Sequence, residues 1–482
     1  VRLDKNWIQD GAPGNGGGLH SGGGDVTITR GIIADNMAVE GGGLWTNGTL
    51  TINGGADGDN DDDDDAEDGD RSFFTVLSGN EASGDEAGIG GGGLYVETGG
   101  MASVRYTLIN GNTANGTAGS GGGVLVADGA SATLAFSEVT GNTANRAGAG
   151  IELFDDGSTD DETTVSLRQV YVANNVIDEG APGNGGGLHA GGAGAVDVSM
   201  STFANNGAVE GGGLWINAAG SLTMGNSTVT GNSSDTDGGG IYDNGGASIA
   251  LSSVTVALNS ADNDGGGLFS ASTDMFTVQN TIVADNSAGG MGPDCSGTFD
   301  SDGYNLIGDA TGCTVNGDDT DTDGQNPMLA PLAANGGFTP THALMEGSPA
   351  IDSGDSAFDV DQRGMTRSMS PDDRGAYETE GGGTSTSTGE EPQAGAFALG
   401  TPQPNPSAGR TRVTFSVAEA APVELALFNV LGQRVLTAFE GPVSATAPQT
   451  VDLDVSGLAS GVYVLRLMSG GDVETRQVTV VR

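Results

Sequence analysis

Carboxylate side chains are so abundant in this chain that their presence alone does not indicate a catalytic site. The 482 residues include 64 Asp and Glu but only 16 Lys and Arg. Hydrolysis of a glycosidic bond needs two carboxyl groups placed across that bond, whereas elimination from a uronic acid needs a base beside groups that neutralise the sugar carboxylate. Basic side chains are therefore the scarce component, and none occurs between Arg168 and Arg363. The best candidate catalytic group joins Arg168 to four aspartates of a short turn insertion: Asp155, Asp156, Asp160 and Asp161.

A second candidate site is a set of aromatic residues that recur with a glycine motif. Five glycine triplets are each followed by an aliphatic residue and then by an aromatic one: Trp45, Tyr95, Trp215, Tyr242 and Phe269. Looser copies of the motif place other residues at the same position: His20, Leu125, Glu152 and His189. Side chains alternate along a strand, so if the aliphatic residue points into a core, the next one points outward.

Such a column of exposed rings is typical of a binding face, and a sugar chain could stack on it. A partner protein covering the rings is a second reading. The third is a stabilising ladder, in which the rings pack against each other and against neighbouring loops.

The sequence gives only a weak signal for a metal site. Asp319, Asp321 and Asp323 alternate before Gly324, as at the start of an EF-hand-type loop, but the twelfth position is Ala330 and not Glu. The acidic run of residues 61–65, inside an insertion at 55–71, also lacks the full spacing and is typical of a solvated loop. We therefore expect no required cofactor, with calcium as an open alternative.

Two cysteines, Cys295 and Cys313, are the only ones in the chain. They lack a histidine partner or a second cysteine pair, which argues against a zinc site. We predict a disulfide that closes a surface loop, in keeping with an oxidising compartment. No apolar run is long enough to span a membrane.

The elements that must position these residues repeat along the chain. An asparagine closes a short apolar run before each copy of the glycine motif: Asn6, Asn36, Asn80, Asn112, Asn142, Asn175, Asn206, Asn232, Asn259 and Asn286. The last four intervals between these positions are 31, 26, 27 and 27 residues. A fixed period in this range indicates a solenoid. The chain opens inside such a repeat, from which we expect an upstream part, including any targeting segment, to be missing.

The repeat predicts a right-handed parallel β-helix of about ten rungs. Its apolar runs are short, alternate with period two and are separated by Gly, Asn and Asp, while no run has helical periodicity. One repeat cannot bury its own apolar face, so the rungs must stack. We expect the asparagines to form one column, joined by hydrogen bonds between their amides.

The charge balance excludes some partners. The formal net charge is −48, and Lys5 is the only lysine. No basic patch is present to meet phosphates, which argues against binding of nucleic acid or anionic lipid. A solvated acidic surface is typical of a secreted protein adapted to salt; widespread calcium binding is the alternative.

Two C-terminal segments resemble known families. Motifs such as Gly347-Ser348-Pro349-Ala350-Ile351-Asp352 and Asp373-Arg374-Gly375-Ala376-Tyr377-Glu378 make the region up to 379 similar to the choice-of-anchor Q domain of bacterial surface β-helix proteins. That resemblance implies extracellular display and no settled activity. We expect residues 291–379 to close the end of the rod, with Asp361–Arg363 and Asp373–Arg374 forming salt bridges or turn hydrogen bonds there.

Residues 380–397 are a Gly/Ser/Thr-rich linker. Alternating strands in 398–482 predict a small antiparallel β-sandwich. Pro404-Asn405-Pro406, the turn at 429–433 and Leu458-Ala459-Ser460-Gly461-Val462-Tyr463 resemble the type A sorting domain of type IX secretion. The resemblance implies that this segment engages the type IX machinery, crosses the outer membrane, and is then attached or removed.

The sequence thus predicts an extracellular or outer-membrane surface protein of a Gram-negative bacterium. It has a rod at 1–290, a closing region, a linker and a sorting domain, and no transmembrane segment. We expect a structural or adhesive role in which the aromatic column binds extracellular polysaccharide. The alternative is a polysaccharide lyase or glycoside hydrolase, because the predicted rod is similar to pectin- and alginate-degrading enzymes, although fold alone does not determine function.

Overall fold

The computed structural model describes two compact units, one within Val1–Gly381 and one within Gly382–Arg482. The described residues are 1–8, 14–55, 71, 73–178, 182–272, 276–317, 320–367, 371–379, 398–400, 402, 407, 409–417, 421–428, 434–443, 448–458, 461–469 and 472–480. The predicted linker at 380–397, the acidic run at 61–65 and Asp319 lie outside them. All regular elements of the described residues are strands, and none is a helix.

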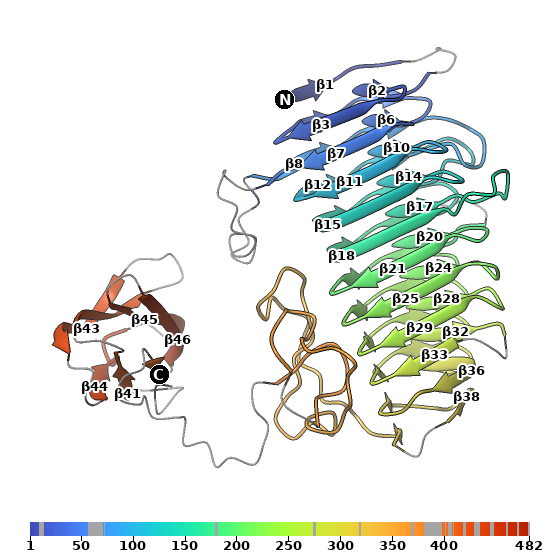
Figure 1. The fold of residues 1–482 in the computed structure, drawn as a ribbon. Coiled ribbons are helices and arrows are strands. Elements are labelled where there is room, and N and C mark those ends of the chain that lie inside the picture. The colour runs from blue at the N-terminus through green and yellow to red at the C-terminus, as the bar shows by residue number, and fades with distance from the viewer. Residues whose placement is uncertain are drawn as a thin grey trace. The chain divides into compact units, whose positions relative to one another are not determined.

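The first unit is a parallel β-helix in which each rung contributes up to four strands (Figure 1). The strands after the glycine motifs form the first column: β2 (Leu19–Ser21), β6 (Leu44–Thr46), β10 (Leu94–Val96), β14 (Val124–Val126), β17 (Ile151–Leu153), β20 (Leu188–Ala190), β24 (Leu214–Ile216), β28 (Ile241–Asp243) and β32 (Leu268–Ser270). The second column contains β3 (Asp25–Thr29), β7 (Thr49–Asn53), β11 (Met101–Arg105), β15 (Ser131–Thr140), β18 (Thr164–Ala173), β21 (Ala195–Ser199), β25 (Ser221–Gly225), β29 (Ser248–Ser252) and β33 (Phe276–Gln279).

The third column continues each second-column strand after a bend, and in β15 and β18 the two run together. It contains β1 (Arg2–Asp4), β4 (Ile32–Ala34), β8 (Thr75–Ser78), β12 (Thr107–Asn110), β22 (Thr202–Ala204), β26 (Thr228–Thr230), β30 (Thr255–Ala257) and β34 (Ile282–Ala284). The fourth column holds short strands in a nine-stranded sheet: β5 (Met37–Ala38), β9 (Glu81–Ala82), β13 (Thr113–Ala114), β16 (Thr143–Ala144), β19 (Val176–Ile177), β23 (Gly207–Ala208), β27 (Ser233–Ser234), β31 (Ser260–Ala261) and β35 (Ser287–Ala288). The all-β class and the parallel solenoid are therefore confirmed.

The predicted asparagine ladder is confirmed and runs through the whole repeat. From Asn6 to Asn286, each Nδ2 donates to the Oδ1 of the next asparagine at 2.8–3.0 Å. Asn286 donates in turn to Oδ1 of Asp294. From Asn36 onward the ladder is buried beside a core of alternating aliphatic side chains. It satisfies polar groups that stacking removes from water, which fixes the register of successive rungs.

Close backbone contacts explain the glycine triplets. Gly41, the first of its triplet, has φ of 59°, a left-handed conformation that disfavours other residues. A Cβ on Gly43, the third, would lie 2.5 Å from the carbonyl oxygen of Gly93 and 3.1 Å from the amide of Asn80. The triplet therefore allows the backbone to turn and to pack closely on both the next rung and the asparagine ladder.

Parallel pairing continues beyond residue 290, so the predicted limit of the rod was too early. The last strands are β36 (Cys295–Ser301), β37 (Leu306–Ile307), β38 (Cys313–Asn316) and β39 (Thr322–Asp323). β36 pairs with β32 and β33, and β38 pairs with β36. Cys295 and Cys313 form a disulfide between these two stacked strands. It links successive rungs and does not close a surface loop.

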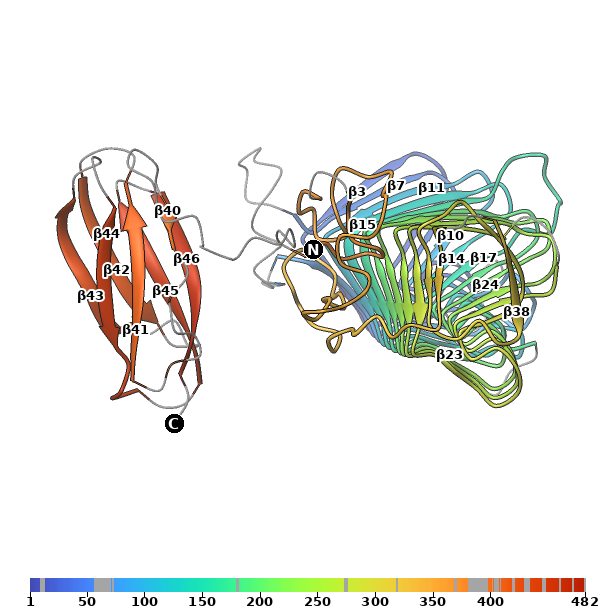
Figure 2. The same ribbon diagram turned by 90° about the horizontal axis from the view of Figure 1, so that it is seen from below.

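The segment from Leu329 to Thr379 does not close the end of the rod as expected. It lies along the side of the rod, against the bend between the second and third columns (Figure 1 and Figure 2). Gln362 Nε2 donates to Oγ1 of Thr202 at 2.7 Å, and Nε2 of His342 lies 2.9 Å from Oγ1 of Thr230. We call this part the lateral segment. Its side chains satisfy polar groups that the bend exposes, which an end cap could not do.

The two residue pairs of the lateral segment that were expected to form salt bridges or turn hydrogen bonds differ in their contacts. Arg363 pairs with Asp361 at 2.7 Å, and both are buried. Among the described residues, Arg374 forms no hydrogen bond or ion pair with Asp373 and instead donates to backbone oxygens of Asn305, Thr320 and Ser353. Arg374 therefore joins the lateral segment to the last rungs of the rod.

The second unit is the predicted antiparallel β-sandwich. One sheet contains β40 (Ala398–Leu399), β41 (Arg410–Ser416) and β44 (Gln449–Asp454). The other contains β43 (Arg434–Val443), β42 (Ala421–Phe428), β45 (Gly461–Ser469) and β46 (Asp472–Val480). A separate apolar core that includes Phe415, Leu425 and Leu465 lies between them.

Candidate functional site

The register of the first column places the residues after the glycine motifs in one line. Trp45 pairs with Tyr95, and Trp215 pairs with Tyr242, which pairs with Phe269. The rings stack almost parallel, with centroids 6.5 Å apart for Trp45 and Tyr95, 6.0 Å for Trp215 and Tyr242, and 4.9 Å for Tyr242 and Phe269. The line forms an aromatic ladder on the outer face of the first column.

The expectation that this ladder is exposed was wrong. Trp45, Tyr95, Trp215 and Tyr242 are only 5–8% exposed, although Phe269 is half-buried. The turns that precede the glycine motifs provide polar partners and cover the rings. Nε1 of Trp45 donates to Glu40 at 3.1 Å, Nε1 of Trp215 donates to Glu210 at 3.3 Å, and the hydroxyl of Tyr95 donates to the oxygen of Gly88 at 3.1 Å.

Burial also suppresses ionisation in the ladder. It raises the pKa of the Tyr95 hydroxyl well above its usual value, and it raises the pKa of Tyr242 to about 12 with help from Glu210. The pKa of Glu40, beside Trp45, is likewise raised by burial. The two tyrosine hydroxyls therefore stay protonated at neutral pH. This is consistent with a structural role for the ladder.

A buried ionic group separates the two stacks of the ladder. Glu152 is fully buried, and its Oε1 lies 3.3 Å from Nη1 of Arg146. Its Oε2 lies 2.9 Å from Nδ1 of His189, although neither atom has a partner in hydrogen-bonding geometry. His189 stacks on Trp215 with centroids 4.6 Å apart. An ion pair in this position holds the stack in register but leaves no open face for a substrate.

The four aspartates proposed for catalysis do not meet Arg168. Asp155 accepts hydrogen bonds from backbone N–H groups of Gly157 and Ala193, and Asp156 accepts one from Ser158. Asp160 and Asp161 are exposed. Arg168 lies near the middle of β18, at the bend, and within the described part of the chain no hydrogen bond or ion pair joins it to the aspartates. The aspartates shape a turn, and Arg168 belongs to a different face.

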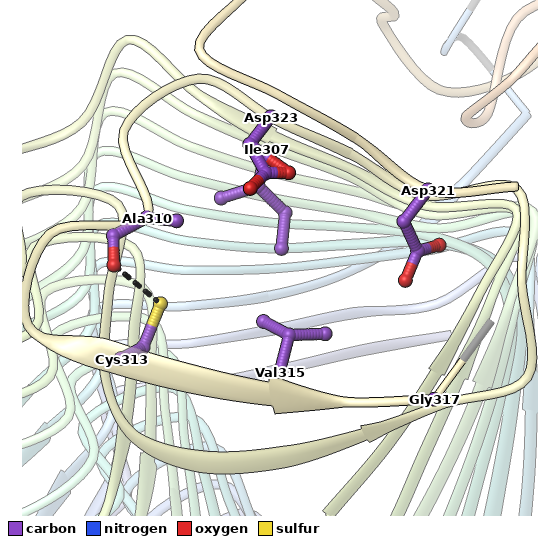
Figure 3. Close-up of a pocket in the computed structure, with 7 residues that line it drawn as sticks. All are labelled: Ile307, Ala310, Cys313, Val315, Gly317, Asp321 and Asp323. Carbon is purple, nitrogen blue, oxygen red and sulfur yellow. Dashed lines mark hydrogen bonds between the residues drawn. The ribbon is translucent and has the colours of Figure 1, made fainter. Parts of the chain in front are cut away.

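Asp321 and Asp323, the two predicted calcium ligands that the structure describes, line a cavity of about 290 Å³ at the end of the rod (Figure 3). Its walls combine Asp321 and Asp323 with apolar side chains such as Ile307 and Val315. Oδ1 of Asp321 already accepts hydrogen bonds from N and Nδ2 of Asn305. Across the described residues, no three His, Cys, Asp or Glu side chains are grouped to hold a metal ion.

A second aromatic group, which the sequence analysis missed, lies at the bend between the second and third columns. Tyr106 and Phe136 occupy this bend in successive rungs, both with φ of 47°. Their rings stack with centroids 5.2 Å apart. Phe74 and Phe338 pack beside them, and Phe338 comes from the lateral segment. With Phe73, these residues form what we call the corner cluster.

The corner cluster differs from the ladder in exposure and in charge. Phe73, Tyr106 and Phe136 are half-buried, whereas Phe74 and Phe338 are buried. The guanidinium of Arg105 lies 5.5 Å from the ring centre of Tyr106 and 5.3 Å from that of Phe136. Arg71 lies over Phe74 and Phe338 and also pairs with Glu138.

Arginines collect along this bend although the chain is strongly acidic. Residues 1–300 contain seven Lys and Arg, and four of them lie on or beside the bend: Arg30, Arg71, Arg105 and Arg168. Arg105, Ala135 and Arg168 share one register position in successive rungs, so the two arginines are about 10 Å apart. The sequence signal for this site was an arginine directly before the bend in two rungs, at Arg105 and Arg168. No recurring motif marks these positions, so the sequence analysis did not find them.

The C-terminal unit matches a family known from other proteins. Residues 403–481 match the family described as the secretion system C-terminal sorting domain. No curated protein matches the chain significantly. Within the described residues, no helix is both long enough and apolar enough to cross a membrane. The chain therefore carries a type IX secretion sorting domain, and the protein is secreted or displayed at the cell surface.

Proposed function

We propose that this protein is a surface-displayed rod that binds an extracellular polysaccharide without cleaving it. The observation that carries the proposal is the sorting domain at 403–481, which supports secretion of the β-helix or its display at the cell surface. The resemblance of the lateral segment to choice-of-anchor Q regions supports display at the outer-membrane surface. A rod of stacked parallel strands offers a linear polymer such as a polysaccharide a long, regular face.

Binding is favoured over catalysis by the arrangement of charged groups. Cleavage requires carboxyl or basic groups that converge on one bond. Asp155 and Asp156 instead accept turn hydrogen bonds, and Arg168 stands apart from them. A lyase or hydrolase remains the alternative, and it would need a different set of residues from the group that the sequence indicated.

The surface charge supports function in a salty medium. A net charge of −48 repels acidic polymers in dilute solution, but salt screens that repulsion over about 10 Å at 0.1 M and less at higher concentration. Adaptation to salt and binding of calcium both fit the acidic surface. We predict that binding requires no cofactor, and the comparison with and without calcium tests this.

The aromatic ladder supports the proposal less well than expected. A ligand could reach the face of Trp215 or Tyr242 only if the covering turn moved, because both are less than a tenth exposed. We therefore assign the ladder to the stability of the rod. Binding of a ligand by Trp45, Tyr95, Trp215, Tyr242 and Phe269 stays a prediction, which alanine variants would test.

The experiment uses the full chain in high salt, with and without calcium. It is mixed with neutral polymers (amylose and xylan) and acidic ones (alginate and polygalacturonate), and both affinity and new reducing ends are measured. The proposal expects retention by at least one polymer and no new ends. New ends on any substrate would establish the enzyme instead, and binding to none of the polymers would contradict the adhesive role.

A further inference from the structure

We propose that the corner cluster and its arginines form the polysaccharide site, and that the site takes an anionic chain. This inference rests on the proposed function and assigns it a place and a substrate class. Three observations carry it. Stacked aromatic rings are half-exposed, arginines lie in a line along the bend, and the lateral segment packs against the bend beside them.

The stacked rings supply the surface on which sugars pack. Tyr106 and Phe136 lie on neighbouring rungs and keep part of each ring exposed. Phe74 supports Tyr106, and Phe338 supports Phe136, through edge-to-face ring contacts. Rings supported in this way lose little conformational freedom when a ligand binds. The apolar faces of sugar rings are suited to such contacts.

The arginines supply the charge that selects the ligand. Arg105 and Arg168 are exposed, and in the described part of the chain neither forms an ion pair. Their spacing of two rungs, about 10 Å, is on the scale of a disaccharide along an extended chain. Guanidinium groups form paired hydrogen bonds with carboxylates and similar planar or tetrahedral anions. Arg30 continues the line at the bend on the N-terminal side.

The lateral segment limits the site at its other end. Thr339 donates to the oxygen of Met200, and Asn226 donates to the oxygen of Val360, so the segment covers the bend from the rung of Met200 onward. Arg168 is in register with Ser199, directly before that rung. Phe338 of the same segment reaches further, to Phe136 and Phe74, and lies under Arg71. Arg105 and Arg168 nevertheless stay exposed.

Charge placement favours an acidic sugar chain over a protein partner. The cluster is narrow and follows the rod, whereas a stable protein interface buries about 800 Å² on each partner. Cations concentrated on one line of a strongly acidic molecule attract a linear polyanion and disfavour a neutral polymer. The shared chemistry of the ligand is a sugar chain with carboxylate or sulfate groups.

The test compares the full-length wild type with two double variants that each lose two positive charges. Arg105→Ala/Arg168→Ala removes two cations from the corner, and Arg2→Ala/Lys5→Ala removes two from the first rung. Affinity is measured by titration calorimetry with polygalacturonate, alginate, dextran sulfate, amylose and poly-glutamate. Each titration is run in 0.1 M and in 1 M salt, where the Debye screening length is about 10 Å and about 3 Å. Thermal unfolding confirms that each variant is folded.

We expect the corner variant to bind the acidic sugars about tenfold to hundredfold more weakly, and the first-rung variant to bind like the wild type. Replacement by lysine should restore part of the affinity. Equal loss in both double variants would overturn the proposal, as would a preference for amylose. If the wild type binds no polysaccharide at all, the proposed function fails and not merely this site.

A second variant separates sugar stacking from charge alone. Tyr106→Asn/Phe136→Asn removes both rings but suits the left-handed backbone, because Asn226 and Asn280 occupy the same bend elsewhere. We expect binding of the acidic sugars to fall at least tenfold. Unchanged sugar binding, or wild-type binding of poly-glutamate as strong as that of polygalacturonate, would show a general polyanion site and contradict the sugar class.

Discussion

The rod carries two stacks of aromatic side chains, and they differ in what covers them. The aromatic ladder lies under the turns that precede the glycine motifs, and its polar atoms bond to Glu40, Glu210 and the oxygen of Gly88. In the corner cluster, Phe338 is buried and packs against Phe136, whereas the outer rings contact arginine and solvent. The same stacking geometry therefore gives a stabilising element in one place and a recognition surface in the other.

The aromatic ladder and the corner cluster differ more in the solvent exposure of their rings than in the types of residue that form them. Buried rings contribute their full apolar area to stability, whereas half-exposed rings retain area that a ligand can bury. Charged partners follow the same division. Glu152 is fully buried within the ladder and pairs with the half-buried Arg146, while Arg105 and Arg168 are exposed at the corner.

The largest expected effect is on the ladder. Trp215→Ala removes a ring that packs between His189 and Tyr242, and it should lower the free energy of unfolding by about 3–5 kcal/mol. Chemical denaturation measures the loss, and polysaccharide binding by the folded variant should stay unchanged. A variant of normal stability that no longer binds sugars would reverse the roles of the two stacks.

A buried charge at the end of the asparagine ladder gives a pH-dependent effect. Burial raises the pKa of Asp294 to about 6. Because the native state binds this proton more tightly than the unfolded state, Asp294 adds stability below its ordinary pKa of 3.8, and that stability is lost as the pH rises through 6. The difference corresponds to about 3 kcal/mol.

Asp294→Asn removes this titration. The melting temperature of the variant minus that of the wild type should therefore be larger at pH 8 than at pH 4, and Asp309→Asn serves as a control on the neighbouring turn. Taking the difference cancels the pH response of the other acidic groups. A difference that does not vary with pH would show that Asp294 is not a buried, strained charge.

A smaller effect is expected where the lateral segment meets the corner. Phe338→Leu keeps apolar volume but removes the stack on Phe74 and the contact with Arg71, for a loss of about 1 kcal/mol. Limited proteolysis of residues 329–379 would detect the loosened segment. Phe358, a partly exposed aromatic of the same segment, offers a matched Phe→Leu control that should have less effect.

The smallest effect on stability is expected at the exposed arginine. Arg168→Ala should change the free energy of unfolding by no more than about 0.5 kcal/mol, because its side chain is exposed and forms no hydrogen bond or ion pair with the described residues. Differential scanning calorimetry measures it. A loss as large as that of Trp215→Ala would assign Arg168 to the structure of the rod and not to its surface.

The periodic parts of the fold were predictable from sequence, because each repeat imposes the same local constraint. The spacing of Asn206, Asn232 and Asn259 gave the solenoid and its amide ladder, and alternation placed Leu214 inside and Trp215 outside. The sandwich followed from regular short strands. These features depend on neighbours one rung away.

The parts that the sequence did not reveal depend on irregular or distant segments. Trp45 and Tyr95 are buried by turns that vary in length from rung to rung. The sequence repeat does not determine the conformation of these turns. The corner cluster needs Phe338, which reaches Phe136 from far along the chain. The bend itself is not marked by glycine, since Tyr106 and Phe136 adopt its left-handed conformation.

The comparison of the two stacks is tested most directly by protection of individual arginines. The full-length protein is treated with phenylglyoxal with and without polygalacturonate, and the modification of each arginine is measured by mass spectrometry. The account predicts that the polymer protects Arg105 and Arg168, while Arg2, which is exposed on the first rung, reacts equally in both samples. Binding of the polymer with no protection of Arg105 and Arg168 would contradict the assignment of the corner cluster as the recognition surface.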